Sequence, residues 1–190
     1  DRKKAPAPRS CYKHHVPPSQ LSEYYTPDKE TFCVTRNPYS RMISEFRYPI
    51  TKEFGAVMKS GKCNAEPLND FLLKKINLTL ANRWVMDCHL LPQSAYVFSW
   101  DQDNMKVVPG ERRCNHVLRQ EHLQQDFNDL MKRFGYEYRL TDHRSATTHW
   151  DSNICDDLSV KDMSPAVLKL INNLMREDFE YLGYEMVGGL

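Results

Sequence analysis

The segment 32–46 constrains the fold of this chain more than any other part of the sequence. It begins with the apolar run Phe-Cys-Val-Thr, which predicts a buried strand. Pro38 follows after a short corner, where a proline can open a helix because its missing N–H would have no helical partner. Met42, Ile43 and Phe46 then recur at helical spacing. The segment therefore predicts a strand, a tight corner and a helix.

The predicted corner carries groups that suit an anion. The positive end of the helix dipole faces the tip of the strand, and anions bind readily at helix N-termini. Arg36 adds a planar guanidinium, whose geometry matches a phosphate. Ser44 adds a hydroxyl about two turns along the same helix. The alternative interpretation is an ordinary strand–helix junction with a solvated arginine.

The sequence of this corner, Arg-Asn-Pro-Tyr-Ser-Arg-Met-Ile-Ser-Glu-Phe, resembles a segment of the sulfotransferases that use 3′-phosphoadenosine 5′-phosphosulfate. In that family the segment binds the 3′-phosphate, and its arginine is followed eight positions later by a serine, as Arg36 is by Ser44. The resemblance implies that these two side chains bind the 3′-phosphate of the donor nucleotide. It also implies the P-loop-like sulfotransferase fold, an α/β fold in which helices flank a parallel sheet.

Other segments resemble the carbohydrate (Golgi-type) branch of the family, and they occur in the family's order over about residues 11–186. They are a histidine segment before the arginine strand, a His…Pro-Gln segment, a strand-to-helix junction and a C-terminal Asp-Phe…Leu-Gly-Tyr ending (14–18, 87–98, 117–127 and 178–184). The resemblance implies transfer of a sulfuryl group to a hydroxyl of an acceptor, which we expect to be a glycan. The partners implied are therefore a donor nucleotide and a glycan.

Strand and helix patterns alternate along the remaining sequence, which is typical of a parallel α/β arrangement. We expect a loose tail over 1–10 and one domain over 11–190. Residues 11–16 are expected to be extended or a short strand. Helices are predicted over about 38–47, 68–80, 123–134 and from 165 through 179, and strands over 31–36, 95–98 and 116–118.

Transfer to an alcohol benefits from a general base, and histidine has a suitable ordinary pKa. In the heparan 2-O-sulfotransferase type, a catalytic histidine lies just before the strand that carries the phosphate-binding arginine. The resemblance implies His15 as the catalytic base, with His14 as the second candidate. In that type two histidines are separated by one residue, whereas here Lys13 takes the place of the outer one. His89 is a competing candidate, and surface histidines without a catalytic role are the alternative.

One part of the family's donor site is missing from the sequence. Sulfotransferases carry a phosphate loop with lysine, glycine and Ser/Thr after their first strand, and no such segment precedes residue 36. We expect the first strand, loop and helix to lie upstream of Asp1, so that this chain holds half of the donor site. The alternative is a catalytically inactive sulfotransferase-like domain that binds nucleotide or glycan. A kinase or NTPase is disfavoured because no Gly-rich loop with Lys-Ser/Thr is present.

Composition bounds the partners of this chain. A net charge of +1 gives no reason to expect nucleic-acid binding. No apolar run approaches the roughly 20 residues that span a bilayer, so membrane attachment is expected only through a segment absent from this chain. The parent protein could then be a single-pass membrane protein. No pair of cysteines has the CxxC spacing of a structural zinc site, and no metal is expected.

The cysteines and a glycosylation sequon bear on the compartment. Six cysteines are compatible with disulfides, although Cys33, in an apolar strand, is expected to be a buried thiol. Asn77-Leu78-Thr79 is an acceptor sequence for N-glycosylation. Together with the resemblance, these features favour the Golgi lumen or another part of the secretory pathway.

Overall fold

The computed structural model describes residues 11–20, 29–47, 63–101, 106–141, 155 and 157–188. The chain divides into two compact units. The first unit comprises Asp1–Cys33, Leu73–His116 and Pro165–Leu190, and the second comprises Val34–Leu72 and Val117–Ser164. The tail predicted for 1–10 lies outside the described residues.

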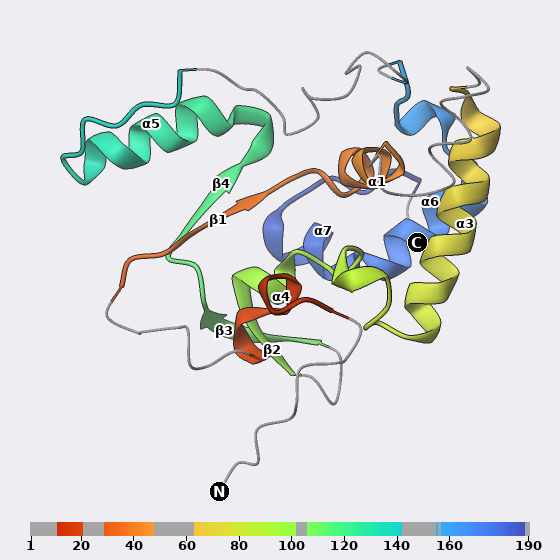
Figure 1. Cartoon of the computed structure of the whole chain (residues 1–190), viewed down its shortest axis with the longest axis horizontal. Helices are drawn as coiled ribbons and strands as arrows, with labels where there is room; N and C mark the ends of the chain where they lie inside the picture. The colour runs from red at the N-terminus through yellow and green to blue at the C-terminus, as the bar shows by residue number, and fades with distance from the viewer. Residues whose placement is uncertain are drawn as a thin grey trace, which may run out of the picture. The chain divides into compact units, whose positions relative to one another are not determined.

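Within the described ranges, helices and short strands are mixed along the chain, and β2, β3 and β4 follow one another without an intervening helix (Figure 1). The strands are β1 (Phe32–Thr35), β2 (Phe98–Asp101), β3 (Lys106–Arg112) and β4 (His116–Arg119). The α-helices are α1 (Pro38–Phe46), α3 (Ala65–Ala81), α4 (Ser94–Val97), α5 (Leu123–Arg133), α6 (Pro165–Leu174) and α7 (Arg176–Leu182). Short 3-10 turns occupy Lys13–His15, Pro18–Gln20, Met86–Cys88, Gln120–His122 and Val160–Asp162.

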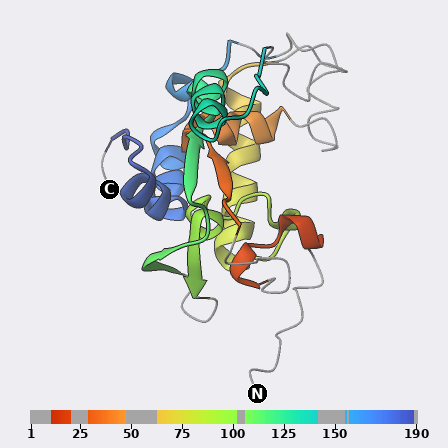
Figure 2. The same cartoon turned by 90° about the vertical axis from the view of Figure 1, so that its left-hand side faces the viewer.

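Strands β1 and β4 pair with each other, and both views show them side by side (Figures 1 and 2). The amide of His116 donates to the carbonyl of Thr31 at 3.1 Å, and the hydroxyl of Thr35 donates to the carbonyl of Leu118 at 3.5 Å. Because the partners advance in the same direction along both strands, the pair is parallel. The parallel sheet with following helices α1 and α5 confirms the predicted α/β class.

The segment that most constrained the fold forms the elements predicted for it. Strand β1 ends at Thr35 and α1 begins at Pro38, with Asn37 as its N-cap. The three apolar residues predicted to face the core, Met42, Ile43 and Phe46, are all buried, and the ring of Phe46 packs edge-on to that of Phe71 at 5.4 Å. Helix α1 is therefore anchored by one apolar face to the core of the second unit.

The strand predicted over 95–98 is wrong. Residues Ser94–Val97 form the short helix α4, and the strand begins only at Phe98, where β2 pairs with β3 in an antiparallel sheet. The reason is a contact distant in sequence: the buried carboxylate of Asp178 accepts the amide of Ser94 at 2.8 Å and the amide of Gln93 at 3.0 Å. A carboxylate at these amides stabilises the start of a helix.

Two other predicted elements differ from the structure. The extended segment predicted over 11–16 contains the turn Lys13–His15, in which the His15 amide donates to the carbonyl of Tyr12 at 2.9 Å. The single C-terminal helix is interrupted at Met175, which separates α6 from α7. Met175 still links the two helices by hydrogen bonds, since its amide donates to the Ile171 carbonyl at 2.8 Å and its carbonyl accepts the Phe179 amide at 3.2 Å.

All six cysteines form disulfides: Cys11–Cys88 and Cys33–Cys114 in the first unit, and Cys63–Cys155 in the second. The prediction of a buried thiol at Cys33 is therefore wrong. Hydrogen bonds also join the residues that flank the disulfide Cys33–Cys114. The Thr31 hydroxyl donates to the carbonyl of Arg113 at 2.9 Å and to Oδ1 of Asn115 at 2.7 Å. Three disulfides indicate an oxidising, secretory-type environment.

None of the helices in the described ranges is both long enough and apolar enough to cross a bilayer.

Candidate functional site

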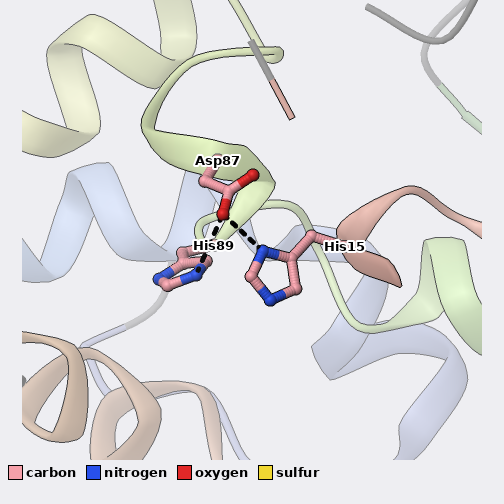
Figure 3. Close-up of side chains that lie close together, drawn as sticks. All are labelled: His15, Asp87 and His89. Carbon is pink, nitrogen blue, oxygen red and sulfur yellow. Dashed lines mark hydrogen bonds and ion pairs between the residues drawn. The ribbon is translucent and has the colours of Figure 1, made fainter. Parts of the chain in front are cut away.

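Two imidazoles and a carboxylate meet in the first unit (Figure 3). Nδ1 of His15 lies 2.7 Å from Oδ2 of Asp87, and Nε2 of His89 lies 4.0 Å from the same oxygen. The two imidazole rings cross edge to face with centroids 4.7 Å apart. All three side chains are partly exposed, at 32%, 25% and 24% of their surface, so the cluster is open to solvent and to a substrate.

The carboxylate is presented by an unusual turn. Met86, Asp87 and Cys88 have positive φ angles of 53°, 53° and 64°, in the left-handed region that residues other than glycine rarely adopt. Such conformations cost of order 1–3 kcal/mol each and persist only where the surroundings enforce them. They also cluster at functional sites, which makes this turn a candidate for one.

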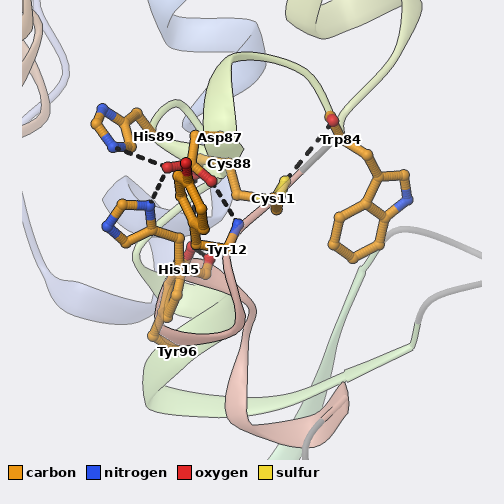
Figure 4. Close-up of polar contacts among 8 residues, drawn as sticks. All are labelled: Cys11, Tyr12, His15, Trp84, Asp87, Cys88, His89 and Tyr96. Atoms are coloured by element: carbon orange, nitrogen blue, oxygen red, sulfur yellow. Dashed lines mark hydrogen bonds and ion pairs between the residues drawn. A yellow bond between two sulfur atoms is a disulfide. The ribbon is translucent and has the colours of Figure 1, made fainter. Parts of the chain in front are cut away.

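Contacts from the N-terminal segment hold this turn (Figure 4). The disulfide Cys11–Cys88 links the two segments covalently, and the Tyr12 amide donates to Oδ1 of Asp87 at 2.5 Å. The hydroxyl of Tyr96 donates to the His15 carbonyl at 2.7 Å. Thus Asp87 is held by the disulfide and the Tyr12 amide, and His15 is held by the Tyr96 hydroxyl.

The structure distinguishes the two histidines predicted as catalytic candidates. His15 reaches Asp87, whereas the exposed His14 stacks on the ring of Tyr12 with centroids 5.6 Å apart. His89, the competing candidate, lies in the same cluster as His15. Sequence reasoning missed Asp87. The available signal was its position two residues before His89, in a segment already singled out.

The electrostatics of the cluster favour an ionised carboxylate. Burial raises the pKa of Asp87, but hydrogen bonds from the Tyr12 amide and His15, with the charges of His15 and His89, outweigh it and hold this pKa below its ordinary value. At neutral pH Asp87 is therefore a carboxylate that accepts hydrogen bonds.

This shift predicts an acid-sensitive contribution of Asp87 to stability. Because the folded pKa lies below the ordinary value of 3.8, the contribution should be complete at pH values above 3.8 and be lost as pH falls through the folded value. Urea unfolding of the wild type and of Asp87→Asn should therefore differ most near neutral pH and converge in acid. A difference that stays constant down to about pH 2 would contradict this assignment.

A single metal ion is a poor match for the observed cluster. The three donor atoms lie within 4.8 Å of one another, which one ion could span. However, two ligands about 2.1 Å from a tetrahedral zinc ion lie about 3.4 Å apart. The 2.7 Å separation of His15 and Asp87 is that of a charge-assisted hydrogen bond instead.

The predicted anion-binding corner lies in the second unit, where β1 leads into α1. The side chain of Asn37 accepts the amides of Tyr39 at 3.0 Å and Ser40 at 3.3 Å, and its own amide donates to Oε1 of Glu121 at 2.6 Å. Since these amides already have partners, an anion at this corner would depend on side chains and on the helix dipole.

Arg36 supplies positive charge at this corner. Burial lowers its pKa, the carboxylate of Glu121 raises it, and the charge of Arg47 lowers it further. The guanidinium nevertheless stays protonated at physiological pH. Arg36 is a partly buried cation near a second cation, so an anion bound beside it would stabilise its charge. Ser44 is partly exposed on α1, two turns from the corner.

The predicted site residues thus fall in different units: His14 and His15 in the first, and Arg36 and Ser44 in the second. A scan against protein-family models matches residues 7–185 to the model described as "Sulfotransferase family". Comparison with curated proteins gives no significant match, and neither does comparison with solved structures.

Proposed function

The chain belongs to the sulfotransferase family, and from this premise we propose that it moves a sulfuryl group from 3′-phosphoadenosine 5′-phosphosulfate to a glycan hydroxyl. The observation that carries the proposal is the corner between β1 and α1, where Arg36 precedes the helix and Ser44 follows two turns later. The family match covers this corner and nearly all of the chain.

In this proposal, Arg36 and Ser44 bind the 3′-phosphate of the donor. The guanidinium can donate two parallel hydrogen bonds to phosphate oxygens, and the serine hydroxyl can donate a third. The positive end of the α1 dipole favours the same charge. Burial is the main cause that lowers the pKa of Arg36, and the nearby Arg47 charge adds to it; a bound phosphate would relieve the repulsion between the two cations.

His15 is the proposed base for the acceptor, with His14 as the second candidate. The acceptor oxygen attacks sulfur, the bond from sulfur to the 5′-phosphate oxygen breaks, and the nucleotide leaves as adenosine 3′,5′-bisphosphate. The hydroxyl proton passes to the imidazole. Partial exposure of His15 and its contact with an ionised carboxylate support this role.

The three disulfides support an oxidising, secretory-type environment, and the proposal names a compartment within it. We place the protein in the Golgi lumen, where glycans are sulfated, with attachment to the membrane through a segment outside this chain. Asn77 is exposed on α3 and is the proposed carrier of an N-linked glycan, whereas Thr79 of the same sequon is buried and donates to the carbonyl of Lys75 at 3.0 Å.

The proposal is tested by transfer of radiolabelled sulfate from the donor to a panel of desulfated glycans, using the full-length protein. We expect label to appear in at least one glycan, with release of adenosine 3′,5′-bisphosphate. Nucleotide binding without transfer to any glycan would instead favour the alternative, a catalytically inactive nucleotide- or glycan-binding domain. Absence of nucleotide binding, of glycan binding and of transfer would refute both functions.

A further inference from the structure

We propose that Asp87 is the positioning residue for the base: its carboxylate fixes the His15 imidazole with Nδ1 protonated and leaves Nε2 as the atom that takes the acceptor's proton. This inference rests on the proposed function and deepens it. It assigns a role to a residue that sequence reasoning missed. It also chooses between the two histidines of the cluster.

The position of the proton follows from the chemistry of the contact. Asp87 is ionised at neutral pH, and an ionised carboxylate only accepts hydrogen bonds. The hydrogen in the 2.7 Å contact with Nδ1 therefore belongs to His15. A neutral imidazole carries one proton, so Nε2 holds a free lone pair. In Figure 3 this second nitrogen lies on the side of the ring away from Asp87.

The same contact supports the charge that proton uptake creates. When Nε2 accepts a proton the ring becomes an imidazolium, and the adjacent carboxylate stabilises it. Nε2 of His89 lies 4.0 Å from the carboxylate, beyond hydrogen-bond distance, so Asp87 orients His15 more strongly than His89. His15 is thus the imidazole prepared for base catalysis.

The surroundings keep both partners in this arrangement. The left-handed turn that carries Asp87 is held by Cys11–Cys88 and by the Tyr12 amide, and the His15 backbone is held by Tyr96 (Figure 4). Asp87 lies next to a disulfide and its side chain accepts the Tyr12 amide, while the His15 backbone accepts the Tyr96 hydroxyl, so the pair loses little freedom when it acts. This is an arrangement expected of a catalytic pair more than of two surface side chains.

Nitrogen-15 NMR of the wild-type chain, labelled at histidine, tests the tautomer directly and requires neither activity nor a variant. We expect His15 near pH 8 to be protonated at Nδ1 and unprotonated at Nε2. The opposite tautomer would overturn the inference. His116 provides a reference signal, since its contact with Glu30 is through Nε2 at 2.9 Å and should show the other tautomer.

Asp87→Asn then tests the consequence for transfer by the full-length protein. Asparagine tolerates the left-handed backbone, so the turn is kept while the charge is lost. We expect kcat to fall by roughly tenfold to a thousandfold, KM to change by less than about twofold, and the Nδ1–H signal of His15 to be lost. Asp70→Asn, the same change at an exposed position of α3, should leave kcat unaltered.

The outcomes separate this inference from the proposed function. If the wild type transfers no sulfate, the proposed function fails, while the NMR result still supports or overturns the assigned tautomer. If the wild type is active and Asp87→Asn retains full kcat, Asp87 is not a positioning residue.

Discussion

Alanine in place of His15 should lower kcat for sulfuryl transfer by about 10²–10⁴-fold, the usual contribution of a general base. The reason is that an alcohol is a weak nucleophile while it keeps its proton, and His15 is the histidine that Asp87 contacts at 2.7 Å. Transfer by the full-length protein is measured under saturating donor and acceptor. Nucleotide affinity should stay close to that of the wild type, because the donor's 3′-phosphate is assigned to Arg36 and Ser44.

Three further substitutions make this test specific. His122→Ala changes an exposed histidine after β4 and should leave kcat unaltered. His14→Ala should change kcat only slightly. Its ring stacks on Tyr12, and no contact with a carboxylate is seen for it among the described residues. If His15→Ala stays active and His89→Ala is inactive, the assignment of the base to His15 is wrong.

Alanine in place of Asp178 should lower the free energy of unfolding by about 3–5 kcal/mol, because it leaves buried donors without their acceptor. The side chain is fully buried and accepts three hydrogen bonds. Two come from Gln93, through its amide at 3.0 Å and Nε2 at 3.1 Å, and one comes from the amide of Ser94 at 2.8 Å. Each unsatisfied buried donor costs roughly 1–3 kcal/mol.

Urea unfolding, followed by circular dichroism, measures this loss. Glu180→Ala is the matched control, since Glu180 is an exposed acid on the same helix, α7, and its removal should change stability by less than about 0.5 kcal/mol. Equal stability of the two variants would show that Asp178 does not hold the start of α4.

The parts of the fold that depend on residues adjacent in the sequence were predictable. The strand, corner and helix around Pro38 follow from local patterns, and α1, α3 and α5 lie close to their predicted ranges. The strand predicted at 95–98 failed because Asp178, more than 80 residues away, overrides the β propensity of Tyr-Val-Phe. No local pattern contains that contact.

In the candidate site, too, local sequence patterns were readable and contacts between distant residues were not. The sequence led to Arg36, Ser44 and His15 as proposed site residues, because they lie beside a strand-and-helix pattern that resembles a family segment. Asp87 was not, since its role depends on a left-handed turn and on the pairing of Cys11 with Cys88, 77 residues apart. Six cysteines allow fifteen pairings, so sequence alone could not have selected this one.

The central claim is that the corner at α1 recognises a 3′-phosphate, and calorimetry with two nucleotides tests it most directly. We expect wild-type protein to bind adenosine 3′,5′-bisphosphate about 100-fold or more tightly than adenosine 5′-monophosphate, which lacks the 3′-phosphate; two charge-assisted hydrogen bonds contribute about 3 kcal/mol or more. Arg36→Ala should remove most of this preference, whereas Arg133→Ala, at an exposed position of α5, should retain it. Equal affinity of the wild type for the two nucleotides would contradict the claim.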